Sequence, residues 1–196
     1  MPAVYDSYAR FYDQLFAPFE RRFLDSWRAE TLSLLPINSA VLELGCGTGA
    51  NFHLYPPSRT AVSTELSAEM IARADTKTVG NVLVQADAQS LPFDANSFDA
   101  AFATLVFCSI PDPLKAFAEA RRVIRPGGRL VLLEHVRPPG MFGKVFDVIN
   151  IATVAVIDDH FNRRTAELAA AAGLNVLEIR EKARRAVNLI VCEVVK

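Results

Sequence analysis

The stretch Val41-Leu-Glu-Leu-Gly-Cys-Gly-Thr-Gly49 decides the fold of this chain. An apolar run that contains one acidic residue leads directly into three alternating glycines. Glycine has no Cβ and readily adopts positive φ, so a ligand can lie against the backbone at Gly45, Gly47 and Gly49. A strand that ends in such a turn and leads into a helix is typical of nucleotide-cofactor sites. The residues Gly45–Ala50 also fit the relaxed dinucleotide pattern, so the glycines alone leave two cofactor classes open.

Length and composition narrow the class of protein. A chain of 196 residues with 51% hydrophobic residues suits one domain with a sizeable core. The net charge of −1 gives no global argument for nucleic-acid binding. The 3 cysteines include no CxxC pair, which argues against a disulfide scaffold or a zinc site and fits a reducing cytoplasm. We see no secretory signal and no membrane-spanning run, so we expect a cytoplasmic protein without a metal site.

Strand and helix patterns alternate through the first 134 residues, which predicts a mostly parallel sheet. We expect seven strands, at 40–44, 61–65, 82–85, 98–103, 129–134, 174–180 and 187–194. Helices are expected at 5–35 in one or two pieces, 67–76, 112–124, 141–157 and 162–172, with Gly173 as a C-cap. The last two strands are joined by the short segment 181–186, so they should be antiparallel neighbours. We interpret 141–157 as a buried or interfacial helix.

Three acidic residues at strand ends help to choose between the cofactor classes. Glu43 precedes Gly45 by two residues, and its charge needs a partner, such as a ligand ammonium reached directly or through water. Pyrophosphate would be repelled there, so Glu43 argues against NAD. Glu65 ends the second strand and can accept both ribose hydroxyls, a feature that NAD sites share. Asp87 closes the third strand, where it can accept a hydrogen bond from an adenine amino group.

Four stretches together resemble the class I S-adenosylmethionine-dependent methyltransferases, in the subgroup that includes the ubiquinone and menaquinone biosynthesis enzymes. The stretches are the glycine loop, Glu65–Met70, Asp87–Phe93 and Arg122–Gly128, and the resemblance covers about residues 38–136. It implies a Rossmann-like α/β fold with a seven-stranded sheet of order 3-2-1-4-5-7-6 and an antiparallel strand 7. It also implies S-adenosylmethionine as cofactor and S-adenosylhomocysteine as product.

We therefore expect a single methyltransferase domain over 1–196. Residues 1–36 would form a helical lid, 37–136 the cofactor-binding core and 137–196 the acceptor side. The expected cofactor-binding residues are Tyr5, Glu43, Gly45, Gly47, Gly49, Glu65, Leu66, Asp87, Ala88, Thr104 and Leu105. The turn Arg125-Pro-Gly-Gly128 marks the family and is expected to have no ligand role. We expect Cys46 and Cys108 to be packing residues.

Shorter motifs bear on the methyl acceptor. Thr104–Ser109, Glu134-His135 and Asp159–Arg163 resemble small bacterial phospholipid N-methyltransferases and mammalian membrane-associated thiol methyltransferases. The resemblance implies a hydrophobic or lipid-like acceptor, with N-methylation of phosphatidylethanolamine as the leading hypothesis. S-methylation of a lipophilic thiol and C-methylation of a quinone precursor are alternatives within the class. A non-catalytic S-adenosylmethionine-binding module and an NAD-dependent oxidoreductase are alternatives from other classes.

Methyl transfer from a sulfonium is an in-line displacement, so the enzyme mainly positions the reactants. Candidate catalytic residues are Tyr8, Tyr12, His135 and His160. Tyrosine faces can hold an ammonium or sulfonium by cation–π attraction, although this spacing also fits a core-facing helix stripe. His135 has the alternative of capping the strand end. Asp159 and Arg163 have the alternative of pairing with each other.

The N-terminal aromatic stripe raises the question of membrane contact. Its aromatic residues, with Arg21, Arg22 and Arg28 nearby, could lie in a lipid interface or could bury themselves on the sheet as a lid. The basic segment Arg180–Arg185 is either a solvated turn or a contact for anionic lipid. Peripheral contact with an anionic membrane, at its inner face, stays an open alternative. We expect a monomer or weak dimer.

Overall fold

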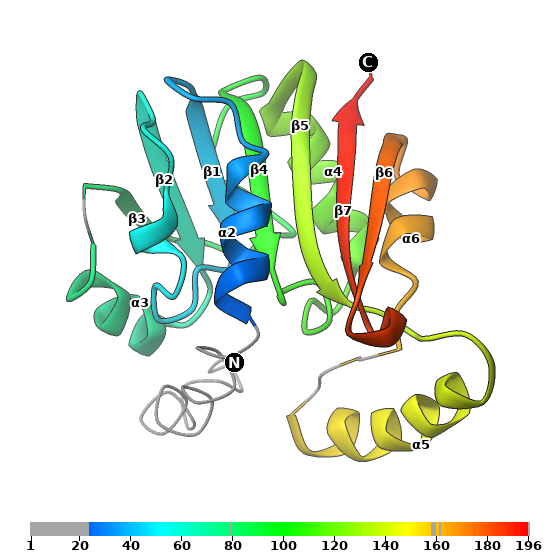
Figure 1. Ribbon diagram of the computed structural model, residues 1–196. Coiled ribbons are helices and arrows are strands. Elements are labelled where there is room, and N and C mark those ends of the chain that lie inside the picture. Colours follow the sequence, from blue (N-terminus) through cyan, green and yellow to red (C-terminus); the bar gives the residue numbers. More distant parts are fainter. Residues whose placement is uncertain (1–23, 79, 158–159, 161, 196) are drawn as a thin grey trace.

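The computed structural model describes residues 24–78, 80–157, 160 and 162–195. Its strands form one seven-stranded sheet in the order β3-β2-β1-β4-β5-β7-β6 (Figure 1). They are β1 (Ala40–Leu44), β2 (Thr60–Glu65), β3 (Val82–Gln85), β4 (Phe98–Thr104), β5 (Ile124–His135), β6 (Leu174–Lys182) and β7 (Val187–Val194). β7 is antiparallel to both of its neighbours, and the other pairs are parallel. The predicted fold class, strand order and antiparallel last strand are confirmed.

Helices cover both faces of this sheet (Figure 1). The described helices are α2 (Asp25–Ser33), α3 (Ala68–Asp75), α4 (Pro113–Val123), α5 (Gly140–Ile157) and α6 (Thr165–Ala171), with 3-10 turns at η3 (Phe52–Leu54) and η4 (Ala183–Arg185). Leu42 and Leu44 of β1 point into the core formed with α4 and α6. Val41 points the other way, into the core shared with α2. Buried parallel strands of this kind need apolar residues on both faces.

The helix ends follow local sequence signals. Ser67 accepts a hydrogen bond from Met70 N at 3.2 Å and so caps α3. Asp112 does the same for α4 through Lys115 N, with a proline in the first turn. Gly173 follows α6 with φ +83°, the left-handed conformation expected of a C-cap glycine. α3 and α4 therefore lie within one residue of their predicted bounds, whereas α6 begins three residues later than predicted.

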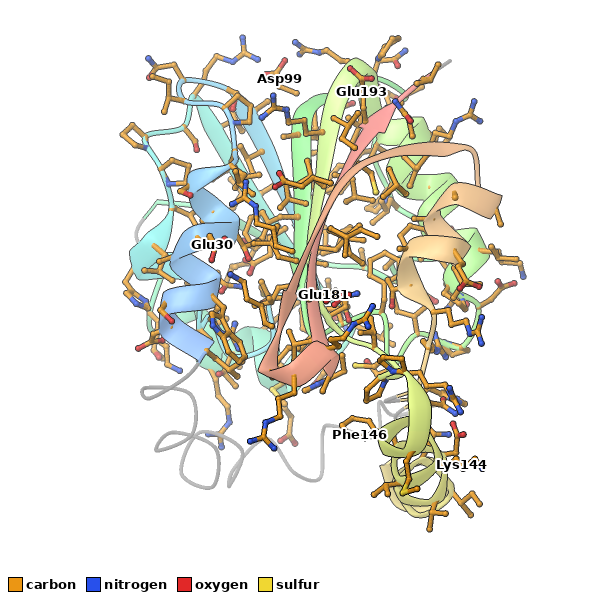
Figure 2. All side chains as sticks on the ribbon, turned by 45° about the vertical axis from the view of Figure 1, so that its right-hand side comes forward. Glu30, Asp99, Lys144, Phe146, Glu181 and Glu193 are labelled. Atoms are coloured by element: carbon orange, nitrogen blue, oxygen red, sulfur yellow. The ribbon has the colours of Figure 1, made fainter. Side chains whose placement is uncertain are left out.

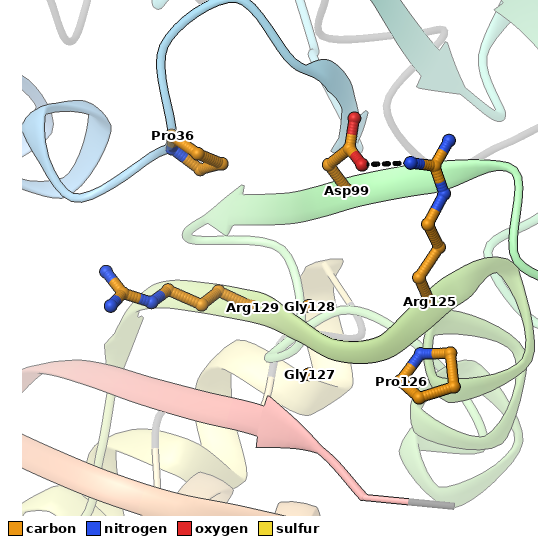
Figure 3. A pocket seen from close by; sticks show the side chains of 7 residues that line it. All are labelled: Pro36, Asp99, Arg125, Pro126, Gly127, Gly128 and Arg129. Atoms are coloured by element: carbon orange, nitrogen blue, oxygen red, sulfur yellow. Dashed lines mark hydrogen bonds and ion pairs between the residues drawn. The ribbon is translucent and has the colours of Figure 1, made fainter.

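β5 begins earlier than predicted. Ile124 pairs with Phe98 and Arg129 pairs with Ala100, so residues 125–128 form a bulge inside the strand where we predicted a free turn. A Cβ on Gly128 would lie 2.6 Å from the carbonyl oxygen of Asp99, so the close strand contact requires glycine. A cavity of about 420 Å³ lies beside this bulge, where Arg125 pairs with Asp99 (Figure 3). It is at the start of β4, away from the glycine loop.

α5 projects beyond the carboxyl ends of the parallel strands, and Figure 2 shows Lys144 and Phe146 there, outside the sheet layers. Its apolar residues Met141, Val148 and Ile151 are 81%, 69% and 72% exposed. The helix is present where predicted, but these side chains are not those of a buried helix. In the part of the chain that the structure describes, no helix is long and apolar enough to cross a bilayer.

The hairpin between β6 and β7 differs in part from a solvated turn. Glu30 of α2 accepts hydrogen bonds from Arg180 at 3.0 Å and from Lys182 at 2.6 Å. Glu181, Ala183, Arg184 and Arg185 are exposed, as a solvated turn requires, whereas Arg180 and Lys182 are half-buried. The hairpin therefore fastens α2 to the sheet.

Candidate functional site

The three glycines of the loop after β1 have different structural roles. Their φ values are +66° at Gly45, +55° at Gly47 and +82° at Gly49, all in the left-handed region. A Cβ on Gly45 would lie 2.5 Å from Val106 Cγ1, and one on Gly49 would lie 2.6 Å from Phe52 Cε2. A Cβ on Gly47 would meet nothing within 4 Å. Gly45 and Gly49 therefore allow tight packing, and Gly47 presents open backbone to a ligand.

Glu65, at the end of β2, lies directly beside this open backbone. Its carboxylate accepts a hydrogen bond from Gly47 N at 3.0 Å and another from Ser67 N at 2.9 Å. A carboxylate has about four lone-pair sites and can accept from several donors at once, as the predicted role at the ribose hydroxyls requires. Leu66 follows with its side chain 52% exposed, which offers an apolar surface that a purine ring can cover. These features fit the nucleoside part of S-adenosylmethionine.

Asp87 lies just beyond the end of β3, the strand that pairs with β2. Its Oδ1 accepts hydrogen bonds from Gln89 N at 2.8 Å and from Gln89 Nε2 at 3.0 Å. Gln89 Oε1 in turn accepts from Asp112 N at 3.0 Å, which ties this loop to the start of α4. Both Asp87 and Ala88 are half-buried. The carboxylate is thus held in place with acceptor capacity left for an adenine amino group.

Glu43 lies within β1 and is 1% exposed. It accepts hydrogen bonds from Asn51 Nδ2 at 2.6 Å and from the Tyr55 hydroxyl, which also bonds Ser63. Burial raises the pKa of Glu43, and the hydrogen bonds from Asn51 and Tyr55 oppose that rise. The partners that we sought in a ligand are present in the protein. Contact with a ligand ammonium stays a prediction.

Arg28 completes this buried network from α2. It is 5% exposed, and its Nη1 donates to Asn51 Oδ1 at 3.0 Å and to Thr104 Oγ1 at 2.9 Å. Of the two alternatives for Arg28, burial on the sheet holds, because its guanidinium is bonded to residues of the sheet side and not exposed to a lipid interface. Thr104 belongs to the same network and is 6% exposed. Nothing in the sequence separates Arg28 from Arg21 and Arg22, and Asn51 and Tyr55 fall outside the motifs that we quoted.

The turn after β4 is strained and firmly held. Leu105 has φ +59°, a costly conformation for a bulky residue, and its N–H donates to Leu133 O at 2.7 Å. The next two N–H groups, of Val106 and Phe107, donate to Glu134 Oε1 at 3.0 and 3.1 Å. Glu134 is fully buried at the end of β5. This carboxylate therefore fixes the turn whose Val106 packs on Gly45.

The two candidate histidines lie on the acceptor side of the same edge. His135 ends β5, and burial lowers its pKa to about 4, with the Ala186 backbone acting in the opposite direction through a hydrogen bond. It is therefore neutral at pH 7. His160 N donates to Cys108 O at 2.9 Å, and Arg163 Nη1 donates to Phe107 O at 2.6 Å. His160 and Arg163 are thus both bonded to the loop after β4.

Several other predicted residues have a clear status. Tyr5, Tyr8, Tyr12 and Asp159 lie outside the described residues, so their roles stay predictions. Within the described ranges, no group of three or more His, Cys, Asp or Glu side chains could hold a metal ion. Cys46, Cys108 and Cys192 form no disulfide and are all buried, which fits the packing role expected of Cys46 and Cys108. Burial raises the pKa of Cys46 and raises that of Cys192 to about 12.

Comparisons with known proteins identify similarity to methyltransferases. Residues 42–132 match the family described as methyltransferase domain. Thiol S-methyltransferase TMT1B of Homo sapiens is 38% identical over 108 residues, which are 51% of this chain and 44% of that protein. Demethylmenaquinone methyltransferase of Thermus thermophilus is 36% identical over 129 residues, which are 62% of this chain and 59% of that protein. The chain spans about half the length of these curated relatives.

Solved structures share the fold. A methyltransferase from Haloferax volcanii, solved in complex with the Trm112 methyltransferase activator, superposes with a TM-score of 0.80 at 19% identity over 100% of both chains. A Thermotoga maritima protein described as a possible histamine N-methyltransferase gives a TM-score of 0.76 at 21% identity over 97% of both chains. S-adenosylmethionine is the methyl donor that this domain implies. The chain therefore contains a methyltransferase domain, within a sheet whose strand order is that of the class I S-adenosylmethionine-dependent methyltransferases.

Proposed function

We propose that this protein transfers the methyl group of S-adenosylmethionine to a lipophilic acceptor. The observation that carries the methyl-transfer part is the open backbone at Gly47, flanked by the Glu65 carboxylate and the exposed side chain of Leu66. A pyrophosphate cofactor would meet carboxylates here, whereas a nucleoside with a positively charged sulfur meets complementary charge.

The residues of the chain act by holding and orienting. When bound, S-adenosylmethionine would supply an electrophilic methyl group, with S-adenosylhomocysteine as the leaving group. Glu65 would hold the ribose, Asp87 would accept from the adenine amino group, and the turn at Leu105 would limit the position of the sulfonium. Alignment of two bound reactants can supply ~7–11 kcal/mol of the barrier. His135 is neutral at pH 7, so its imidazole can form a hydrogen bond to an acceptor, although its lowered pKa makes it a weak base.

Two observations support a lipophilic acceptor. α5 lies beyond the carboxyl edge of the sheet (Figure 1), and its apolar side chains Met141, Val148 and Ile151 are exposed. The relatives that match at 36–38% identity are named for a thiol and for demethylmenaquinone. A lipophilic thiol is therefore the first acceptor to test and a demethylated quinone the second. Phosphatidylethanolamine, suggested by the short motifs, is the third.

An acceptor screen with methyl-labelled S-adenosylmethionine tests this proposal. The acceptors are an alkyl thiol, a demethylated quinone and phosphatidylethanolamine vesicles, each assayed with the wild type and with Glu65→Gln as a matched control. We expect label in one organic product, and less of it with the control variant. Tight S-adenosylmethionine binding without label in any acceptor would instead favour the non-catalytic module. Quenching of NADH fluorescence on titration would contradict the cofactor assignment.

A further inference from the structure

A second cleft, of about 330 Å³, opens where three segments of the acceptor side meet. The linker from β5 to α5, the start of α6 and the β6–β7 hairpin form its walls. We call it the arginine cleft, and its polar lining is Arg137, Arg163, Arg164, Arg185, Thr165 and Asn188. Val136, the residue after His135, also lines it. The cleft is therefore adjacent to the acceptor half of the carboxyl edge.

Arginines dominate the charged lining of the arginine cleft. Four arginines line it with two acidic residues, Glu167 and Glu181, and Arg137 pairs with Asp147, outside the lining, at 2.7 Å. Arg164 pairs with Glu167 at 3.1 Å and Arg185 pairs with Glu181 at 2.7 Å, so each carboxylate steadies one guanidinium. A planar guanidinium with several N–H donors suits the oxygens of a phosphate group.

Two buried polar atoms in this cleft lack a partner. Thr165 is 1% exposed, and its Oγ1 makes no hydrogen bond. The buried Oδ1 of Asn188 makes none either. Both residues line the same cleft, although they come from α6 and from β7. Buried polar groups are normally satisfied, so a bound polar group is the expected partner. A hydroxyl can donate to an anion, and an amide can present its N–H₂ group by rotation.

We propose that the arginine cleft binds a phosphate group carried by the methyl acceptor. This inference rests on the proposed methyl transfer for its biological meaning, but the binding itself does not depend on activity. Arg163 lines the cleft and also donates to Phe107 O at 2.6 Å, in the loop after β4. A phosphate seated in the cleft would therefore place the rest of an amphiphile near His135 and that loop. The acceptor class inferred in this way is an amphiphile with a phosphate head, which moves the phospholipid ahead of the thiol and the quinone among the acceptors to test.

Calorimetric titration tests this with three probes: inorganic phosphate, dodecyl phosphate below its micelle concentration, and dodecanethiol as a neutral chain of the same length. The variants are Thr165→Val, which preserves side-chain shape, and the double variant Arg164→Gln with Arg185→Gln. Arg129→Gln is the control, because Arg129 lines the cavity near the start of β4. Thermal melts verify that each variant is folded.

We expect dodecyl phosphate to bind the wild type and the control equally. Since charge-assisted hydrogen bonds are lost, the double variant should weaken it by about tenfold and Thr165→Val by about threefold. Binding of dodecanethiol as tightly as dodecyl phosphate would overturn the proposal, as would equal affinities in all variants. Binding of inorganic phosphate as tightly as dodecyl phosphate would show a free-phosphate site and would overturn the acceptor assignment. Titration of S-adenosylmethionine in parallel reports on the proposed function separately, because its binding does not involve this cleft.

Discussion

The carboxyl edge of the sheet has a proposed cofactor half, at the ends of β1 to β4, and a proposed acceptor half, from β5 to α6 and the β6–β7 hairpin. The charged side chains of the two halves differ in burial. On the cofactor half, Glu43 and Arg28 are almost fully buried and are linked through Asn51. On the acceptor half, ion pairs such as Arg164 with Glu167 have side chains that are 64% and 69% exposed. Buried polar groups are costly to leave unpaired, whereas exposed ion pairs contribute little to stability.

This difference separates what must stay fixed from what can change. A cofactor site gains from rigid, preorganised groups, and the buried network beneath the glycine loop provides that rigidity. The exposed pairs on the acceptor side can be exchanged with little effect on folding. We therefore expect substitutions on the cofactor half to cost stability, and substitutions on the acceptor half to alter binding.

The strongest test of this contrast is Arg28→Met. The change removes the donor to Asn51 and Thr104 and leaves their oxygens buried, so the free energy of unfolding should fall by ~3–4 kcal/mol. Arg59→Met, at an arginine whose side chain is 59% exposed, is the control and should change it by less than ~1 kcal/mol. Urea denaturation measures both. Equal losses in the two variants would remove the distinction between the halves.

A glycine pair sharpens the contrast within the loop itself. Gly45→Ala forces a Cβ against Val106 and should destabilise the fold by ~2–3 kcal/mol. Gly47→Ala meets open space and should cost only the ~1 kcal/mol of left-handed backbone. Thermal melts report the stabilities, and titration reports S-adenosylmethionine affinity. Relative to its loss of stability, Gly47→Ala should lose more S-adenosylmethionine affinity than Gly45→Ala. A larger relative loss of affinity in Gly45→Ala would contradict the ligand role of Gly47.

His135 lies on the acceptor half, yet burial lowers its pKa, so protonation of its imidazole should reduce the stability of the fold. Its pKa is about 4 in the fold against the usual 6.5, so between these values the unfolded chain binds a proton that the folded chain does not. The free energy of unfolding should therefore decrease by ~2 kcal/mol as the pH falls from 6.5 to 4. In His135→Gln this decrease should shrink. An unchanged pH profile in the variant would assign the effect to other groups.

Glu65→Gln gives the smallest expected effect. The amide keeps an oxygen for Gly47 N but loses the charge that strengthens bonds to ribose hydroxyls, so S-adenosylmethionine should bind ~1–2 kcal/mol more weakly. Stability should change little, which separates this residue from Arg28. Calorimetry with S-adenosylmethionine measures the affinity. Unchanged affinity would show that Glu65 only supports the backbone of the loop.

The sequence predicted the sheet well because its signals are local. The apolar runs, the glycines and the capping residues Ser67 and Asp112 act on their own neighbours in the chain. The bulge at 125–128 escaped prediction because it depends on the approach of Asp99 from another strand. Turn residues alone do not report whether a strand continues across them.

The candidate site was predicted less completely. The positions of Glu65 and Asp87 follow from strand ends, which adjoin one another in any parallel sheet. The partners of Glu43 were missed because Asn51 and Tyr55 reach it only after the loop has folded back. The sequence left Arg28 open between a lipid interface and the sheet, because an arginine on an aromatic-rich helix has the same local pattern in both places.

The buried cysteines have a practical consequence for the acceptor assay. A thiol methyltransferase presents a reactive methyl group to sulfur, yet Cys46, Cys108 and Cys192 are all shielded from solvent. The thiolate is the nucleophile, and the raised pKa of Cys46 and of Cys192 keeps both thiols protonated at neutral pH. Buried and protonated thiols are poor acceptors for a methyl group and poor partners for a mixed disulfide with an added thiol. Label that appears on sulfur in such an assay can be attributed to the added acceptor.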